Sequence, residues 1–219
     1  MEINRKISPK KKGEQMIIKP AVRKIIVQNL NWIVLAAFFF ILGLVTAVFS
    51  FKNGIFINNI TDTQYEMLKK IAEMVFEGPA WKGIAILFFN NFFASLQMML
   101  LGVLLSMPPL LGLFANGALL GSLLVELGRE GVPLLSFWIA GIMPHGIFEL
   151  PAFIISAAFG LKAGYHLLFP LPQKKRRESL GIVWKEFFAL LPLVISLLVL
   201  AAIIEVLLTP LLVQQFLNI

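Results

Sequence analysis

The sequence predicts an all-α protein whose helices form a polytopic membrane bundle with about five crossings. Only 14% of the residues are charged and 58% are hydrophobic, whereas soluble domains are about 25% charged. The charges are clustered, which leaves several apolar tracts near the ~20 residues that a spanning helix needs. No long polar linker separates these tracts, so we expect one compact bundle in contact with the lipid bilayer.

The chain contains no cysteine, which excludes disulfides, thiolate metal ligands and thiol catalysis. Its net charge of +7 is concentrated in particular loops, a distribution that favours membrane orientation and not nucleic-acid binding. The first 31 residues carry eight Lys and Arg and lack the layout of a cleaved signal peptide. We therefore expect the first hydrophobic segment to be retained.

Three parts are expected along the chain. Residues 1–31 form a basic cytoplasmic tail, with a short interfacial helix near Ala21–Leu30. Residues 32–213 form the transmembrane domain, and residues 214–219 form a C-terminal tail. Within the domain, the polar interval 52–80 has apolar residues at helical spacing after a Thr63–Glu66 capping box. It is either an external amphipathic helix or a solvated connector packed on the bundle.

Five segments are apolar enough to cross a membrane, with prolines and short polar breaks between them. The paired prolines of "SMPP" predict a turn between the second and third segments. Residues 133–169 are too long for one simple crossing, so we expect a short helix, a break at Met143–Pro144 and a full helix to Leu168. The other expected spans are Trp32–Phe51, Trp81–Leu105, Leu110–Leu127 and Trp184–Val213.

The charge pattern predicts the orientation of the bundle in the cell membrane. The N-terminal tail and the interval 170–186 are basic, whereas the interval 52–80 is slightly acidic. Cytoplasmic loops carry the excess of Lys and Arg. Five crossings place both basic segments inside and six do not, so we expect a cytoplasmic N-terminus and an external C-terminus.

The fourth expected span contains a pair of polar residues that are costly at membrane depth. His145 and Glu149 are four residues apart and share one helical face. Small residues continue close to that face and allow close helix packing, as do the glycines of the third span. The predicted packing residues are Gly112, Gly117, Gly121, Ala152, Ser156, Gly160 and Gly164. The other intramembrane polar residues are Asn90, Asn91, Asn116 and Glu205.

Several interpretations of this pair are open. The polar groups can satisfy one another and specify packing, in which case mutation lowers stability and a chelator changes little. His145 and Glu149 can instead form half of a divalent-metal site, such as a zinc site, that needs Glu205, asparagines or a second copy to complete it. A titratable pair beside a broken helix also suits proton or ion transport, or a channel for small solutes. The chain has no HExxH or G-x-S-x-G motif, and we expect neither catalysis nor a required cofactor.

Three stretches carry a resemblance to a known family. "FFNNFF", "LFANGALLG" and "PHGIFELPAFIISAAFGLKAG" resemble stage II sporulation protein M and the broader membrane family named after it. The similarity runs from about Phe88 to Gly164, and its most specific part is the PHG-x-x-E-L-P-A core, Pro144 through Ala152. The matching polar and glycine positions are Asn90, Asn91, Asn116, Gly117, His145, Gly146, Glu149 and Gly160.

The resemblance implies a membrane component of the machinery that remodels peptidoglycan while the forespore is engulfed during sporulation. In that complex it would anchor two partner hydrolases, stage II sporulation proteins D and P. A bundle with small-residue packing faces and little soluble mass agrees with a non-enzymatic scaffold that could form homo-oligomers, such as a homodimer. Relatives also occur in organisms that do not sporulate, so the residues themselves establish only the membrane scaffold.

Overall fold

The structure is a computed structural model that describes residues 20–53, 70, 73–75 and 77–217. Its described elements are helical. The long helices are α2 (Leu30–Asn53), α4 (Ala80–Leu100), α5 (Met107–Arg129), α7 (Met143–Leu168) and α8 (Arg176–Leu207). The shorter elements are α1 (Pro20–Gln28), η1 (Leu101–Val103), α6 (Leu134–Phe137), η2 (Trp138–Ile142) and α9 (Thr209–Leu217).

Five helical segments in the described chain are long and apolar enough to cross a membrane, which confirms the predicted fold class. They cover residues Leu30–Ser50, Ala80–Val103, Met107–Arg129, Leu134–Leu168 and Arg176–Leu207. The segment containing α7 has the largest buried share, 44% of its most apolar window. Helix α7 contacts α2, α4, α5 and α8 and is therefore the central helix of the bundle.

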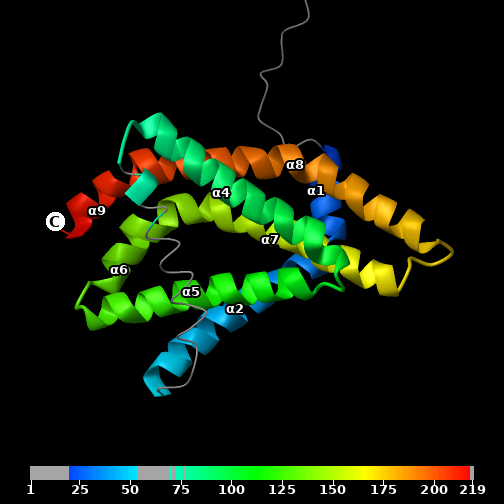
Figure 1. Ribbon diagram of the computed structural model, residues 1–219, viewed down its shortest axis with the longest axis horizontal. Coiled ribbons are helices and arrows are strands. Elements are labelled where there is room, and N and C mark those ends of the chain that lie inside the picture. Colours follow the sequence, from blue (N-terminus) through cyan, green and yellow to red (C-terminus); the bar gives the residue numbers. More distant parts are fainter. Residues whose placement is uncertain (1–19, 54–69, 71–72, 76, 218–219) are drawn as a thin grey trace, which may run out of the picture.

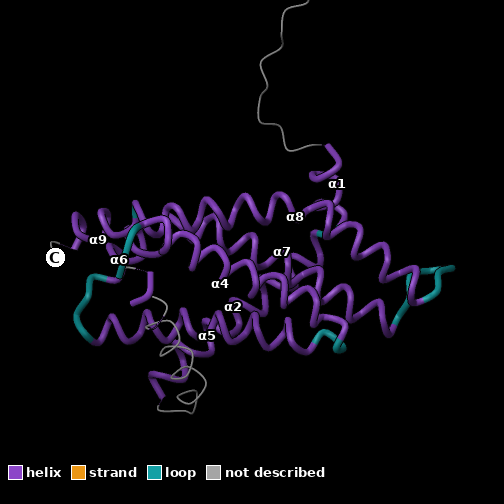
Figure 2. Tube along the Cα trace, turned by 45° about the horizontal axis from the view of Figure 1, so that its top comes forward, coloured by secondary structure: helices purple, strands orange, loops and turns teal. Residues whose placement is uncertain are grey.

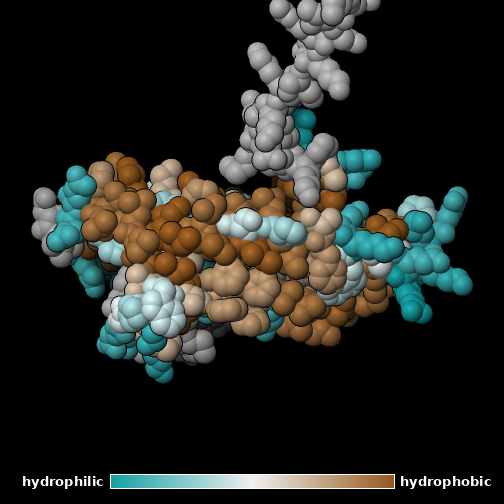
Figure 3. Space-filling model, turned by 90° about the horizontal axis from the view of Figure 1, so that it is seen from above, coloured by the Kyte–Doolittle hydropathy of each residue, from teal (hydrophilic) through white to brown (hydrophobic). Residues whose placement is uncertain are grey.

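The connecting turns lie toward the two ends of the bundle (Figures 1 and 2). The turn after α8 and the Gly131 loop between α5 and α6 occupy one end, together with α9. The loop 169–175 and α1 occupy the other end. Between them, the face seen in Figure 3 is predominantly hydrophobic, and hydrophilic residues gather at its ends. An apolar band with polar ends is the surface expected of a bundle that spans a bilayer.

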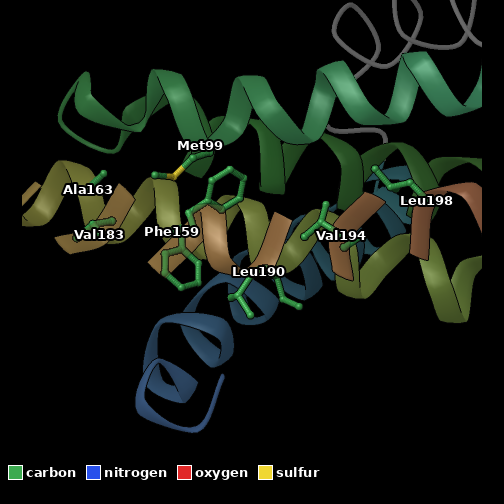
Figure 4. Packing of buried hydrophobic residues seen from close by; sticks show 10 residues of the cluster. Met99, Phe159, Ala163, Val183, Leu190, Val194 and Leu198 are labelled. Carbon is green, nitrogen blue, oxygen red and sulfur yellow. The ribbon is translucent and has the colours of Figure 1, made fainter. Parts of the chain in front are cut away.

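The main core lies where α4, α7 and α8 meet (Figure 4). Phe159 and Phe187 are almost completely buried there, with ring centroids 6.0 Å apart. Met99 and Leu190 fill the space beside them. Large side chains from α7 and α8, together with Met99 of α4, therefore form the main apolar core of the bundle.

The expected break in the fourth span is a π-helical turn. The chain remains helical from Leu134 to Leu168, with α6 joined to α7 through Trp138–Ile142. Pro144 follows in the first turn of α7, where its missing amide hydrogen matters least. The bend therefore comes from the wider turn before Pro144 (Figure 1). The whole segment Leu134–Leu168 is one candidate membrane span.

The expected limits of the last span, Trp184 and Val213, are wrong at both ends. Helix α8 begins at Arg176, where Glu178 accepts a hydrogen bond from the Lys175 backbone amide at 3.0 Å. This cap allows the charged run to enter the helix. Helix α8 ends at Leu207, and α9 begins with Thr209, because Pro210 cannot donate the amide hydrogen that a continuous helix requires. Helix α9 continues to Leu217, past residue 214, where the C-terminal tail was expected to begin.

The interval 52–80, which was predicted to be external, and the basic tail are described only in part. The Thr63–Glu66 capping box and residues 1–19 lie outside the described residues. Residues 20–28 form α1, close to the interfacial helix expected there. Val75 is 2% exposed and packs near Leu87 and Ala202, so this part of the interval lies against the bundle.

Candidate functional site

The site begins at the first turns of α7. His145 and Glu149 are one helical turn apart and both are half-buried. The π-turn and Pro144 set the start of this helix inside the apolar zone, which brings the pair into the bundle. Pro151 lies farther along the same helix, which continues through it.

Glu205 reaches the same point from the last turns of α8. One ligand atom each from His145, Glu149 and Glu205 lie within 4.8 Å of one another. His145 Nδ1 also lies 3.4 Å from the Thr209 hydroxyl, which in turn donates to the Ile204 carbonyl at 3.3 Å. The beginning of α7 therefore meets the junction of α8 and α9 through polar groups.

His145, Glu149 and Glu205 line a cavity of about 400 Å³ between the helices. Volumes of this size are common for small-molecule sites. The Asn91 side chain hydrogen-bonds to Glu149. Ser95, one turn farther along α4, also lines the cavity. A carboxylate, an imidazole, an amide and a hydroxyl thus face one space inside a largely apolar bundle.

Asn90 and Asn116 lie along the exposed part of the cavity wall. The Asn90 amide donates to Asn91 Oδ1 at 3.1 Å. The Asn116 amide donates to the Gly112 carbonyl at 2.8 Å. Both side chains line the cavity and are exposed. The structure therefore brings all six predicted polar residues to one cavity, with three of them close enough to share an ion.

The predicted small residues occupy several helix contacts. A Cβ at Gly117 would lie 1.9 Å from the Phe40 carbonyl oxygen, and one at Gly121 would lie 2.5 Å from that of Leu44. Gly112 faces the Met98 side chain. On α7, Ala152 and Ser156 are fully buried, and the Ser156 hydroxyl donates to the Ala152 carbonyl at 2.9 Å.

The last two predicted glycines lie where α7 meets the turn between α4 and α5. A Cβ at Gly160 would lie 2.2 Å from the Met98 carbonyl oxygen, and one at Gly164 would lie 2.2 Å from Ser106 Oγ. Ser106 donates a hydrogen bond to the Leu161 carbonyl at 2.9 Å. Its φ of 64° is unusual for a residue with a side chain, so this turn is held by its contacts with α7.

A second polar cluster was missed in the sequence. Lys162 pairs with Glu186 at 2.5 Å and donates to Asn29 Oδ1 at 2.7 Å. Asn29 Nδ2 donates to the same Glu186 oxygen at 3.1 Å. The signal available was a lysine inside the predicted span 144–168 and a glutamate of opposite charge inside the predicted span 184–213. Asn29, between α1 and α2, gave no comparable signal.

His166 lies near that second cluster and away from the cavity. Its Nδ1 lies 3.0 Å from the Phe169 carbonyl, and its ring makes an edge contact with Trp32. The contact with Trp32 packs the end of α7 against the beginning of α2. These contacts give His166 a packing role at the end of the span.

The fold and the cavity define a polytopic helical membrane protein with a polar site inside the bundle. A family model described as Stage II sporulation protein M matches residues 36–210, which is most of the chain. The protein belongs to this family, as the sequence resemblance predicted. The chain is also 40% identical over 97 residues to an uncharacterized protein of Methanocaldococcus jannaschii, an alignment covering 44% of this chain and 52% of that relative. No solved structure matches.

Proposed function

We propose that the chain is a non-enzymatic membrane anchor for peptidoglycan-remodelling hydrolases that act during forespore engulfment. The family match over residues 36–210 is the observation that carries this proposal. The shape supports it, because the described loops are short and the five long helices contain most of the described mass. A protein of this shape is suited to holding partners at the membrane.

The partners of this proposal are stage II sporulation proteins D and P, and the contact lies on the external side. The N-terminus is cytoplasmic in this arrangement. The end of the bundle near α1 carries Arg23, Lys24 and the run Lys174–Arg177. The opposite end carries four carboxylates, Glu73, Glu77, Glu126 and Glu130, and two basic residues, Lys82 and Arg129, so it is acidic on balance. The basic end faces the cytoplasm by the positive-inside rule. The acidic end and the interval 52–80 are then available to external partners.

The proposal includes a homo-oligomeric form. Asn90 and Asn116 are exposed in the middle of spanning helices α4 and α5. Exposed amides at this depth are unfavourable against lipid, and hydrogen bonds between membrane helices contribute about 0.6–2 kcal/mol each. A second copy that covers these amides would remove the cost.

Capture of partners from sporulating cells tests the proposed function. We expect the tagged chain to retain both hydrolases, together with untagged copies of itself, after solubilisation in mild detergent. Reversal of Glu66, Glu73 and Glu77 to Lys should reduce hydrolase capture severalfold, because these charges lie in the proposed external surface. The control is Glu14→Lys in the N-terminal tail, a reversal of the same sign on the proposed cytoplasmic side, which should retain capture.

Absence of both hydrolases from the captured wild-type complex would contradict the anchor function. Equal capture by the wild type and the triple variant would instead exclude the acidic interval as the contact surface. Comparable membrane levels of all three proteins are the condition for reading either result.

A further inference from the structure

We propose that His145, Glu149 and Glu205 bind one zinc ion between the beginning of α7 and the end of α8. The three side chains come from two helices, and their ligand atoms lie within 4.8 Å of one another. They face a cavity of about 400 Å³, which leaves room for a further ligand on the ion.

The charged side chains that line this cavity favour binding of a cation. Glu149 and Glu205 lie close together, and no Lys or Arg is among the described residues that line the cavity. Two neighbouring carboxylates repel one another in a medium of low dielectric constant unless a proton or a cation lies between them. The Asn91 side chain occupies only part of the hydrogen-bonding capacity of the Glu149 carboxylate. A divalent ion would neutralise both carboxylates at once.

The ligand set favours zinc over the alkaline-earth ions. Calcium takes six to eight oxygen ligands and magnesium needs a near-ideal octahedron of oxygens, neither of which suits an imidazole. Imidazole with carboxylates is a set that zinc accepts, and three protein ligands with one open position is its common arrangement at reactive sites. Zinc bonds of about 2.0–2.1 Å place tetrahedral ligands roughly 3.3 Å apart, so modest side-chain rotations would close the site.

Ser95 provides a second and independent observation. It lines the same cavity, is 2% exposed, and its hydroxyl has no hydrogen-bond partner. Other helical serines of this bundle, Ser156 and Ser196, donate to the carbonyl four residues earlier. A buried hydroxyl without a partner is unfavourable, and a ligand held in the cavity would supply one. Water on the open position of the zinc ion fits this role.

The groups around the three ligands also suit a metal site. A histidine that binds metal usually makes a hydrogen bond through its other ring nitrogen, and a ligating carboxylate is itself hydrogen-bonded. The Thr209 hydroxyl lies 3.4 Å from His145 Nδ1, which leaves Nε2 for the ion. The Asn91 side chain provides the bond to Glu149. The ion would therefore join α7 to α8 at a point supported from α4 and α9.

Metal analysis of the detergent-purified full chain tests the site. After equilibration with zinc and removal of unbound metal, we expect about one zinc per chain for the wild type. Glu205→Gln should lower zinc affinity by about tenfold or more, since even changes outside the ligand shell cost tenfold to a hundredfold. The matched control is Glu186→Gln on the same helix, which removes a carboxylate that pairs with Lys162 far from the cavity and should retain zinc.

A second measurement keeps the test valid if the variant folds poorly. Chelation of the wild type should lower its unfolding temperature, and zinc should restore it, whereas magnesium should not, because an ion that binds only the folded state stabilises it. Wild-type protein without stoichiometric zinc, or equal zinc affinity in wild type and Glu205→Gln, would overturn the proposal. Both readouts use purified protein, so they do not depend on the partner hydrolases.

Discussion

Lys162 joins three parts of the chain at the end of the bundle opposite the cavity. Its ammonium group contacts Glu186 on α8 and Asn29 between α1 and α2, and it lies 5.7 Å from the centre of the Phe159 ring. Lys162 is 8% exposed. A cation this deeply buried is tolerated only when its hydrogen bonds are satisfied, so the three side chains stabilise one another as a unit.

Lys162→Met should destabilise the protein by about 1.5–3 kcal/mol, because it leaves Glu186 and Asn29 without their charged partner. Thermal unfolding in detergent measures this effect. The double variant Lys162→Met with Glu186→Leu should recover part of the loss, since both charges are then absent. Lys185→Met, at an exposed neighbouring position of α8, is the control and should change little. Additive losses in the double variant would show that the pair does not act as a unit.

The residues of the two polar clusters were unequally predictable from the sequence. His145 and Glu149 could be found because an i, i+4 spacing fixes their common face. Glu205 stood out as a carboxylate within an apolar run. Ser95, Thr209 and Asn29 could not be found, because their roles depend on how the helices are aligned along one another. That alignment arises from packing of whole helices and is not encoded by any local pattern.

At the level of elements, helices α2 and α5 pack against each other along an extensive interface in which their backbones approach closely. Gly43 meets the Phe114 backbone, and Gly117 meets that of Phe40. Contacts of this kind let dispersion forces act between two backbones, which is the main source of helix association where lipid competes for apolar side chains. The glycine positions in α5 therefore set the distance between these helices.

Gly117→Ala should destabilise the bundle by about 1–3 kcal/mol, because its Cβ would lie 1.9 Å from a backbone oxygen that cannot move independently of α2. Gly181→Ala in α8 is the matched control. No atom lies within 4 Å of the Cβ position there, so it should raise stability by about 0.5–1 kcal/mol through better helix propensity. Thermal unfolding of both variants decides the matter. A neutral Gly117→Ala would mean that α2 and α5 can separate freely.

The sequence predicted the number and type of the spanning helices better than it predicted the residues at which those helices begin and end. Long apolar tracts are enough to define spanning helices, and the five predicted segments are present. The end of α8 at Leu207 was missed because its apolar composition continues through α9. The π-turn at Trp138–Ile142 was expected only as a break near Pro144. Both depend on local backbone hydrogen bonding, which hydropathy does not report.

At the scale of the whole molecule, the two polar clusters lie toward opposite ends of α7. The cavity with His145 and Glu149 lies in its first turns, and Lys162 lies in its last two. The first is beside the acidic end of the bundle and the second beside the basic end. The proposed orientation therefore places the cavity in the outer half of the membrane and the Lys162 cluster in the inner half.

This orientation can be tested directly because the chain has no cysteine of its own. Single replacements Asp62→Cys, Glu130→Cys and Lys175→Cys report on the external interval, the loop before α6 and the basic loop before α8. With a cytoplasmic N-terminus, a membrane-impermeant thiol reagent added to intact cells should label positions 62 and 130. Position 175 should react only after the membrane is opened, because the excess of Lys and Arg holds its loop inside. Labelling of position 175 in intact cells, with 62 protected, would reverse the orientation and place the cavity near the cytoplasm, where external hydrolases could not reach that end.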